Sequence, residues 1–140
     1  MKQIDKHQQD WDEPINENFE KFGNSDYTDN VIYLNGAQKD TNGGQIWWRC
    51  SILGETKLYQ IEGYVQLPTV AAGQTIDVFN IPGLTSTVRS VMIVLKDGFK
   101  ADSIYLDKSG NPGTFCISNY SGQTQNSWIA KYCIWVICDN

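Results

Sequence analysis

The side chains that most often perform acid–base or nucleophilic chemistry are sparse in this sequence. It contains one histidine, His7, which lies in a polar N-terminal stretch. A serine or cysteine nucleophile with a histidine base is therefore not expected. The four cysteines have no C-x-x-C spacing, and Cys133 and Cys138 fall on opposite faces of any strand that contains both. The sequence therefore predicts no zinc site.

Acidic residues could support one further kind of chemistry, glycoside hydrolysis, which needs two carboxylates a few ångströms apart. Most acidic residues here stand at turns, where Asp and Glu are common, and Glu62 has Arg49 as an expected partner. Asp107, Ser109 and Asn111 have the alternating spacing of a calcium loop, although the same residues are typical of an ordinary turn. We therefore predict no catalysis, no cofactor and no metal ligands. The carboxylates available to a hydrolase are Glu55, Glu62, Asp77, Asp97, Asp102 and Asp107.

Saccharide binding fits the composition better than catalysis does. Aromatic residues make up 12% of the chain and include five tryptophans. Trp47 is predicted to point outward beside Tyr64, with Arg49 and Glu62 next to them. An exposed aromatic ring with polar neighbours can stack on a pyranose ring and hydrogen-bond its hydroxyl groups. The same aromatic pair could instead stabilise its own hairpin or contact another subunit.

The loop Asn119–Asn126 is a second candidate binding site. Its amides and hydroxyls surround one tyrosine, which is typical of adaptable polar binding loops. We expect Tyr120 to supply an aromatic platform and Gln123, Gln125 and Asn126 to supply hydrogen bonds. Long polar loops between strands often carry binding residues.

The candidate binding residues must be held in position by β-strands. The strongest strand pattern in the sequence is that of a β-hairpin. Apolar residues alternate with polar ones through Ile46–Leu67, on both sides of the polar segment Gly54–Lys57. If Leu53 pairs with Leu58, similar side chains meet on both faces of the hairpin. The expected outward pairs are then Trp47 with Tyr64, Arg49 with Glu62, and Ser51 with Gln60.

The remaining chain is typical of short strands separated by turns. Val88–Lys96 is strongly β-like, and Trp128–Cys138 is apolar on both faces. A strand that is apolar on both faces is expected in the middle of a sheet or at a subunit interface. About eight such strands predict an all-β fold, a β-sandwich or jelly-roll-like head that spans residues 31–140.

Residues 1–30 are predicted to form an N-terminal helix and a linker. Pro14 suits the first helical turn, Asp12 or Glu13 could cap it, and Gly23 stands just past the end. Its apolar face either packs on the same chain or associates with other copies. Because this face and the doubly apolar final strand both need covering, we expect a homotrimer. The apolar residues at helical spacing are Trp11, Ile15, Phe19 and Phe22.

Charge and hydropathy limit the classes of partner. The net charge of −5 and the isoelectric point near 4.7 argue against nucleic acid or an anionic membrane as a partner. No apolar run approaches the roughly 20 residues of a membrane span. The first residues lack the apolar core of a secretion signal, so we expect synthesis in a reducing cytoplasm with all four thiols free.

The order of motifs resembles a known family. The segments that carry the resemblance are WDEPINENFEKF, VIYLNGA, LYQIEGYVQLPTVAAGQTIDVFNIPG and IYLDKSGNPGTFCISN, followed by a final strand that begins with tryptophan. They resemble the C-terminal receptor-binding heads of tail fibre and baseplate proteins from phages and prophages of Gram-positive bacteria. Many members have Arg-Pro soon after the Pro-Gly turn, whereas Leu84–Arg89 contains no proline. The matching motif positions are Gly73, Ile76, Phe79, Pro82, Gly83, Asp107 and Gly110.

This resemblance implies a function, a location and a set of partners. It implies a homotrimer that belongs to a virion tail, is assembled in the bacterial cytoplasm, and binds host cell-wall polysaccharide without catalysis. Other phage tail or baseplate proteins would be its further partners. A purely structural tail or baseplate subunit is the main alternative, and a glycan hydrolase is a second one. The family's ligand residues lie in variable loops, so none is transferred to this chain.

Overall fold

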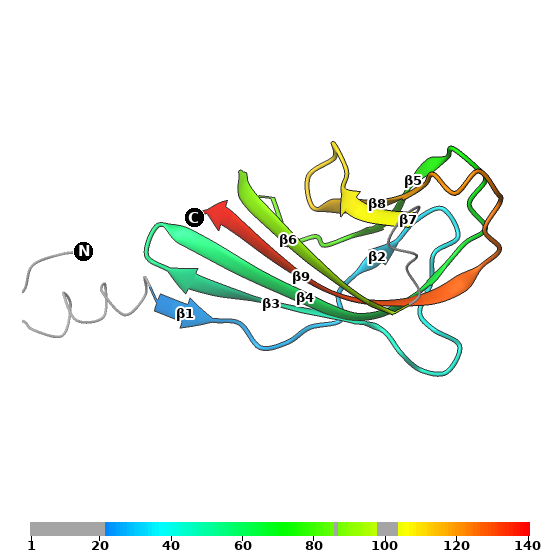
Figure 1. The fold of residues 1–140 in the computed structure, drawn as a ribbon. Coiled ribbons are helices and arrows are strands. Elements are labelled where there is room, and N and C mark those ends of the chain that lie inside the picture. The colour runs from blue at the N-terminus through cyan, green and yellow to red at the C-terminus, as the bar shows by residue number, and fades with distance from the viewer. Residues whose placement is uncertain (1–21, 86, 98–103) are drawn as a thin grey trace, which may run out of the picture.

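The computed structural model describes residues 22–85, 87–97 and 104–140, which form two antiparallel sheets (Figure 1). Within these residues the larger sheet has the order β1-β3-β4-β9-β6, with β1 Phe22–Asn24, β3 Ile46–Leu53, β4 Thr56–Leu67, β9 Trp128–Asp139 and β6 Val88–Asp97. The smaller sheet has the order β2-β5-β8-β7, with β2 Ile32–Tyr33, β5 Thr75–Asn80, β8 Thr114–Asn119 and β7 Ile104–Lys108. The prediction of an all-β fold is confirmed. The predicted helix falls mainly on residues outside the described part of the chain.

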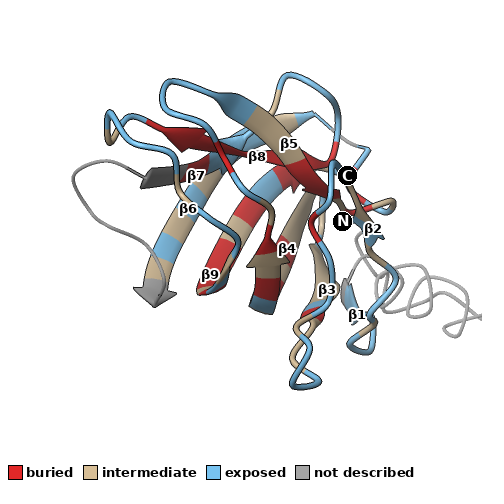
Figure 2. Ribbon diagram, turned by 90° about the vertical axis from the view of Figure 1, so that its right-hand side faces the viewer, coloured by how far each residue is buried: buried red, intermediate tan, exposed pale blue. Residues whose placement is uncertain are grey.

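The core lies between the two sheets, which pack face to face (Figure 2). Phe79 of the smaller sheet stacks on Phe115 of the neighbouring strand, with ring centroids 5.1 Å apart. Its other contact is with Tyr132 of the larger sheet, at 5.5 Å and an interplanar angle of 6°. All three side chains are fully buried, so this aromatic stack joins the sheets through the centre of the core.

The β3–β4 hairpin forms as predicted but in a different register. Leu53 pairs with Thr56 rather than with Leu58, which leaves the two-residue loop Gly54-Glu55. Gly54 has φ of +66°, a conformation that suits tight hairpin turns and that glycine adopts without strain. The shift of two residues changes every cross-strand partner but keeps each side chain on its predicted face. The observed outward pairs are Trp47 with Glu62, Arg49 with Gln60, and Ser51 with Leu58.

The final strand, β9, is apolar on both faces and lies in the middle of the larger sheet between β4 and β6. This is one of the two placements that the sequence predicted. Tyr132, Ile134 and Val136 point into the core and are fully buried. On the opposite face Ile129 and Ile137 remain 38% and 39% exposed. The outer face of this sheet is thus apolar in part and is not covered by any described element.

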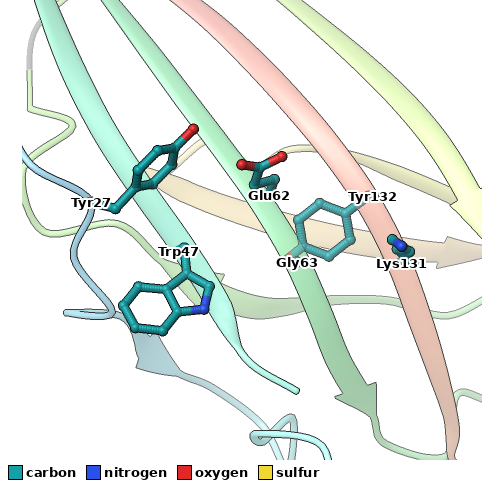
Figure 3. A pocket seen from close by; sticks show the side chains of 6 residues that line it. All are labelled: Tyr27, Trp47, Glu62, Gly63, Lys131 and Tyr132. Atoms are coloured by element: carbon teal, nitrogen blue, oxygen red, sulfur yellow. The ribbon is translucent and has the colours of Figure 1, made fainter.

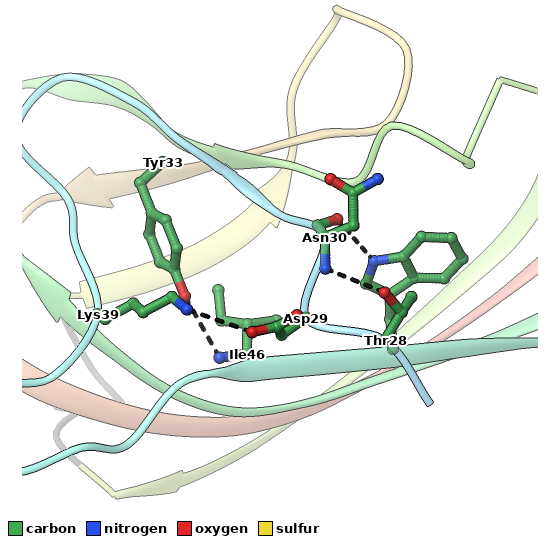
Figure 4. Close-up of polar contacts among 7 residues, drawn as sticks. Thr28, Asp29, Asn30, Tyr33, Lys39 and Ile46 are labelled. Atoms are coloured by element: carbon green, nitrogen blue, oxygen red, sulfur yellow. Dashed lines mark hydrogen bonds and ion pairs between the residues drawn. The ribbon is translucent and has the colours of Figure 1, made fainter. Parts of the chain in front are cut away.

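The N-terminal part of the described chain follows the edge of the larger sheet. Phe22, which the helical pattern included, lies instead in β1 and pairs with Leu53. Further along, Trp48 donates a hydrogen bond from its indole nitrogen to the Asn30 carbonyl at 2.9 Å, and Lys39 forms an ion pair with Asp29 at 3.3 Å (Figure 4). A segment with the composition of a linker is therefore attached to the sheet, and the domain boundary at residue 30 stays a prediction.

The connection between β5 and β6 covers the inner face of the hairpin, whose turn extends beyond the smaller sheet (Figure 1). The Tyr59 hydroxyl donates a hydrogen bond to the Gly83 carbonyl at 2.6 Å. A Cβ atom on Gly83 would lie 2.6 Å from the Trp48 ring, so only glycine fits this close approach. Leu84 beside it is buried in the core. The Pro-Gly turn thus covers the part of the hairpin that lies beyond the smaller sheet, and it extends the core there.

All four cysteines are unpaired thiols in this fold. Cys116, Cys133 and Cys138 are buried, and Cys50 is half-buried. Burial raises the pKa of the thiols of Cys50, Cys116 and Cys138 above 9.0. These three thiols are therefore protonated and unreactive at neutral pH.

Candidate functional site

A depression of about 400 Å³ lies on the outer face of the larger sheet (Figure 3). Its residues come from β3, β4 and β9 and from the chain between β1 and β2, which follows the sheet edge. Because neighbouring strands lie about 4.8 Å apart, three strands bring side chains from distant parts of the sequence together. The lining residues are Tyr27, Trp47, Glu62, Gly63, Lys131 and Tyr132.

Two aromatic rings lie on one side of the depression. Trp47 is 42% exposed because it alternates along β3 with the buried Ile46 and the core-facing Trp48, and Tyr27 is 39% exposed. Figure 3 shows both rings on one side of Gly63, with Lys131 on the other. The predicted outward orientation of Trp47 is therefore observed in the structure.

Charged groups fix the position of Tyr27. The Arg49 guanidinium lies 4.8 Å from the centroid of the Tyr27 ring, within the range of a cation–π contact. Burial raises the pKa of the Tyr27 hydroxyl, and its hydrogen bond with Glu62 raises that pKa further. Tyr27 therefore stays protonated at neutral pH and donates to the Glu62 carboxylate.

The predicted pairing of Arg49 with Glu62 is replaced by two other contacts. Arg49 donates two hydrogen bonds to the side-chain oxygen of Gln60, at 3.1 and 2.9 Å, because the observed register places these residues opposite each other. Glu62 lies opposite Trp47 and next to Tyr27. Its carboxylate therefore lines the depression and accepts the Tyr27 hydrogen bond instead of pairing with Arg49.

Lys131 and Tyr64 form the other side of this face. They pair across β4 and β9, and the Lys131 ammonium lies 4.9 Å from the centroid of the Tyr64 ring. Tyr64 is 38% exposed, in agreement with its predicted outward position. This cation–π contact with the Tyr64 ring holds the Lys131 ammonium beside the depression.

Gly63 lies between the aromatic side and Lys131. Its φ is +135°, and a Cβ atom there would approach the Gln45 carbonyl oxygen to 2.1 Å. Any other residue would have to displace the backbone of β3 where Ile46 pairs with Gly63. The glycine thus lets the two strands approach closely and leaves the centre of the depression without a side chain.

The second candidate site, the Asn119–Asn126 loop, is well ordered by one buried side chain. The Asn119 amide is fully buried and donates hydrogen bonds to the carbonyls of Val70 at 2.9 Å and Gln123 at 2.8 Å. Its oxygen accepts hydrogen bonds from the backbone and hydroxyl of Ser121 at 3.0 and 2.7 Å. The loop is therefore anchored to the rest of the domain.

Three of the four residues that the sequence singled out in this loop are exposed. Tyr120 is 66% exposed, Gln123 and Asn126 are exposed, and Gln125 is half-buried. Gln125 already donates to the Ser121 hydroxyl at 3.1 Å, so its amide is partly used within the loop. None of these side chains lines the depression, so the two candidate sites are separate.

Four of the six residues that line the depression were not among the predicted site residues: Tyr27, Gly63, Lys131 and Tyr132. Tyr27 was assigned to a linker, and only the pairing of that segment with the edge of β3 brings it to the sheet face. Lys131 carried a usable signal, because it is the only charged residue within Trp128–Cys138. A single lysine in an otherwise apolar strand must point to the solvent face.

The depression combines groups that suit binding of a polar ring compound. Two exposed aromatic faces can stack on a ligand, Glu62 can accept hydrogen bonds, and Lys131 can donate them. Glu62 is the single carboxylate among the lining residues. In the part of the chain that the structure describes, no group of three or more His, Cys, Asp or Glu could bind a metal ion. That part also contains no helix long and apolar enough to cross a membrane.

Comparisons with known proteins give one result. No protein-family model and no curated protein sequence matches the chain. Among solved structures, the head domain of phage bIL170 is similar at a TM-score of 0.45 and 12% identity, over 81% of this chain and 96% of that one. That structure is described in connection with a common fold for the receptor-binding domains of lactococcal phages.

Proposed function

We propose that this chain is a phage tail receptor-binding protein that binds a host cell-wall saccharide without catalysing a reaction. The observation that supports this best is the exposed pair of Trp47 and Tyr27 beside the depression that also contains Glu62 and Lys131. The motif order supports the tail location and the Gram-positive host. A structural likeness with a TM-score below 0.5 is too weak to add support.

The proposed ligand stacks one sugar ring on Trp47 and places its hydroxyl groups near Glu62 and Lys131. The aromatic ring meets the apolar face of the sugar, while the carboxylate accepts and the ammonium donates hydrogen bonds. Tyr27 is already positioned by Arg49 and Glu62 before any ligand arrives. A pre-positioned side chain loses little entropy on binding.

The loop with Tyr120 is a second proposed contact. Its ring is 66% exposed on a loop that Asn119 anchors, so it could stack on a further sugar of the same polysaccharide. Gln123, Gln125 and Asn126 would then supply amide hydrogen bonds. In the proposed homotrimer, the loop of one chain and the depression of its neighbour could share one ligand.

The test compares two substitutions on the same sheet face. Cell-wall polysaccharides purified from Gram-positive strains, printed as an array, serve as the probe. We expect Trp47→Ala to bind about tenfold more weakly than the wild type, since stacking contributes about 0.5–1.5 kcal/mol beyond the buried area. Leu53→Ala is the matched control, because Leu53 is 52% exposed on the same face and does not line the depression.

The array also separates binding at either site from no binding at all. If Trp47→Ala and Tyr120→Ala both bind as the wild type does, neither site takes the saccharide. If the wild type binds no polysaccharide, the structural alternative gains, in which this subunit contacts other tail or baseplate proteins. The exposed Leu53, Met92 and Ile137 would suit such protein contacts. Degradation of polysaccharide that Glu62→Gln abolishes would instead indicate a hydrolase.

A further inference from the structure

The polar and aromatic part of the outer sheet face continues past the depression. Along β4, Glu62, Tyr64 and Gln66 alternate with residues that include the buried Val65 and Leu67, so all three point outward. Successive residues of an antiparallel strand advance about 3.4 Å, which places Gln66 about 14 Å beyond Glu62. A line of outward side chains therefore runs from the depression toward the end of the sheet.

Tyr64 stands on this line next to the depression. The Lys131 ammonium lies 4.9 Å from its ring centroid and covers one face of the ring, yet the side chain is still 38% exposed. A Cβ atom on Gly44 would lie 3.0 Å from the Tyr64 Cβ and 3.1 Å from Asp40 Oδ2. The missing side chain thus lets the Asp40 carboxylate lie beside the tyrosine. Aromatic surface with an acceptor next to it suits a sugar, which has both apolar C–H groups and hydroxyls.

Beyond Tyr64, two amides and a hydroxyl bond to one another across the end of the sheet. Gln38 pairs with Gln66 where β3 no longer accompanies β4, so their side chains share one face. The Gln38 amide nitrogen donates to the Gln66 side-chain oxygen at 3.3 Å, and the Gln66 amide nitrogen donates to the Ser127 hydroxyl at 3.3 Å. Ser127 in turn donates to the Leu67 carbonyl at 2.7 Å. These bonds hold the side chains of Gln38, Gln66 and Ser127 in a line, here called the polar row.

The polar row keeps hydrogen-bonding capacity after these internal contacts. A primary amide has two N–H donors and an oxygen with two lone pairs, and the bonds within the row use one donor of each glutamine. Gln38 and Ser127 are exposed and Gln66 is half-buried, so the row is accessible from solvent. Side chains that are already held in place lose little entropy when a ligand binds.

We propose that Tyr64 and the polar row form a second sugar-binding subsite in line with the depression, so that this face binds an oligosaccharide of at least two units. The inference rests on the proposed saccharide-binding function and extends it. One sugar stacks on Trp47 in the depression, and the next meets the exposed part of the Tyr64 ring and the polar row. All of these residues belong to one chain, so the second subsite needs no contribution from a neighbouring protomer.

The chemistry of the second subsite favours an uncharged, hydroxyl-rich sugar. The polar row contains no charged side chain, and its amides and hydroxyl both donate and accept hydrogen bonds, as sugar hydroxyls do. The carboxylates of Asp40 and Glu62 lie on either side of the route between the subsites and would repel an anionic group there. The row ends at Ser127, which directly follows Asn126, so a longer ligand would next reach the Asn119–Asn126 loop.

NMR titration of the ¹⁵N-labelled full chain tests the second subsite. The probes are fragments of one, two and three sugars, sorted by length after partial acid hydrolysis of Gram-positive cell-wall polysaccharide. We expect two-sugar fragments to bind about tenfold more tightly than single sugars, because the second ring adds aromatic contact and hydrogen bonds. The side-chain amide signals of Gln38 and Gln66 should shift much more with two sugars than with one.

Gln66→Ala should lower the affinity for two-sugar fragments about fivefold and leave that for single sugars unchanged, because the depression keeps all its lining residues. Gln38→Ala is a second variant with the same expected result. Asn24→Ala is the matched control, since it removes an exposed amide from the same sheet. Asn24 is level with Leu58 of β4, about 27 Å from Gln66 along the strand, so this variant should bind both lengths as the wild type does.

The outcomes separate this inference from the proposed function. Equal affinity for one and two sugars would overturn the second subsite and leave saccharide binding at the depression intact. A preference for two sugars that survives in both Gln66→Ala and Gln38→Ala would also overturn it, because the second sugar would then bind elsewhere. If the wild type binds no fragment of any length, the proposed function fails and the second subsite fails with it.

Discussion

The hydroxyl groups of Tyr59 and Tyr132 allow a matched test of what stabilises the core. Tyr59 is 3% exposed and Tyr132 is fully buried, both on the inner face of the larger sheet. The Tyr59 hydroxyl donates to the Gly83 carbonyl at 2.6 Å, whereas the Tyr132 hydroxyl has no hydrogen-bond partner among the described residues. Replacing either tyrosine by phenylalanine removes one oxygen and keeps the ring.

The two replacements should differ in their effect on the free energy of unfolding. An internal hydrogen bond contributes about 0.5–1.5 kcal/mol net, and Gly83 is exposed enough for its carbonyl to bind water once Tyr59 is changed. We therefore expect Tyr59→Phe to lose about 1 kcal/mol. Tyr132→Phe removes a buried group whose lost hydration costs about 1–3 kcal/mol, so its stability should equal or exceed that of the wild type.

Urea unfolding of both variants and the wild type, at one pH and one protein concentration, measures the difference. Equal m values would show that the exposed surface of the unfolded state is unchanged. We expect a lower midpoint for Tyr59→Phe and an equal or higher one for Tyr132→Phe. A Tyr132→Phe variant less stable than Tyr59→Phe would refute the reasoning, because the unpartnered hydroxyl would then be contributing more than the bonded one.

Three further outcomes follow from single positions. Gly63→Ala should destabilise the fold by more than about 2 kcal/mol in urea unfolding, since the new Cβ would meet the Gln45 carbonyl; an unchanged midpoint would contradict this. Asn119→Asp should speed hydrogen exchange in residues 120–126, because the buried amide donors are lost, while exchange in β4 stays slow. Burial raises the pKa of Tyr132 above 10.0, so stability is fully present below pH 10 and falls above it, as the unfolded tyrosine loses its proton first. Tyr132→Phe should therefore flatten the loss of stability measured above pH 10.

The faces of the strands could be predicted from the sequence, but the register could not. Alternation with a period of two places Trp47 outward and Trp48 inward. This assignment stays the same when the pairing register shifts by an even number of residues. A shift of two residues is thus invisible to the pattern, and it exchanged the expected partner of Arg49 from Glu62 to Gln60. The turn sequence distinguishes between the two registers, because a glycine followed by one residue suits a two-residue loop.

The candidate site was predictable to the extent that its residues lie on the hairpin. Trp47 and Glu62 could be placed on one outward face from their spacing. Tyr27 could not, because it reaches the face through the edge pairing of a segment with no periodic signal. For the same reason β1 was missed: three residues are too few to show alternation, and Phe22 also fits a helical stripe.

The central position of β9 determines how this protein can reach its native state. β4 and β6 are not neighbours in the larger sheet, and β9, which follows both in the chain, lies between them and pairs with each. The β3–β4 hairpin can form early because its residues are close in sequence, but the larger sheet remains in two parts until β9 inserts between them. Until then the two long strands β4 and β6 each have an exposed, unpaired edge. Competition between insertion of β9 and aggregation should therefore limit refolding at high protein concentration. Refolding yield should consequently depend on the last strand far more than on the hairpin from which the rest of the sheet extends.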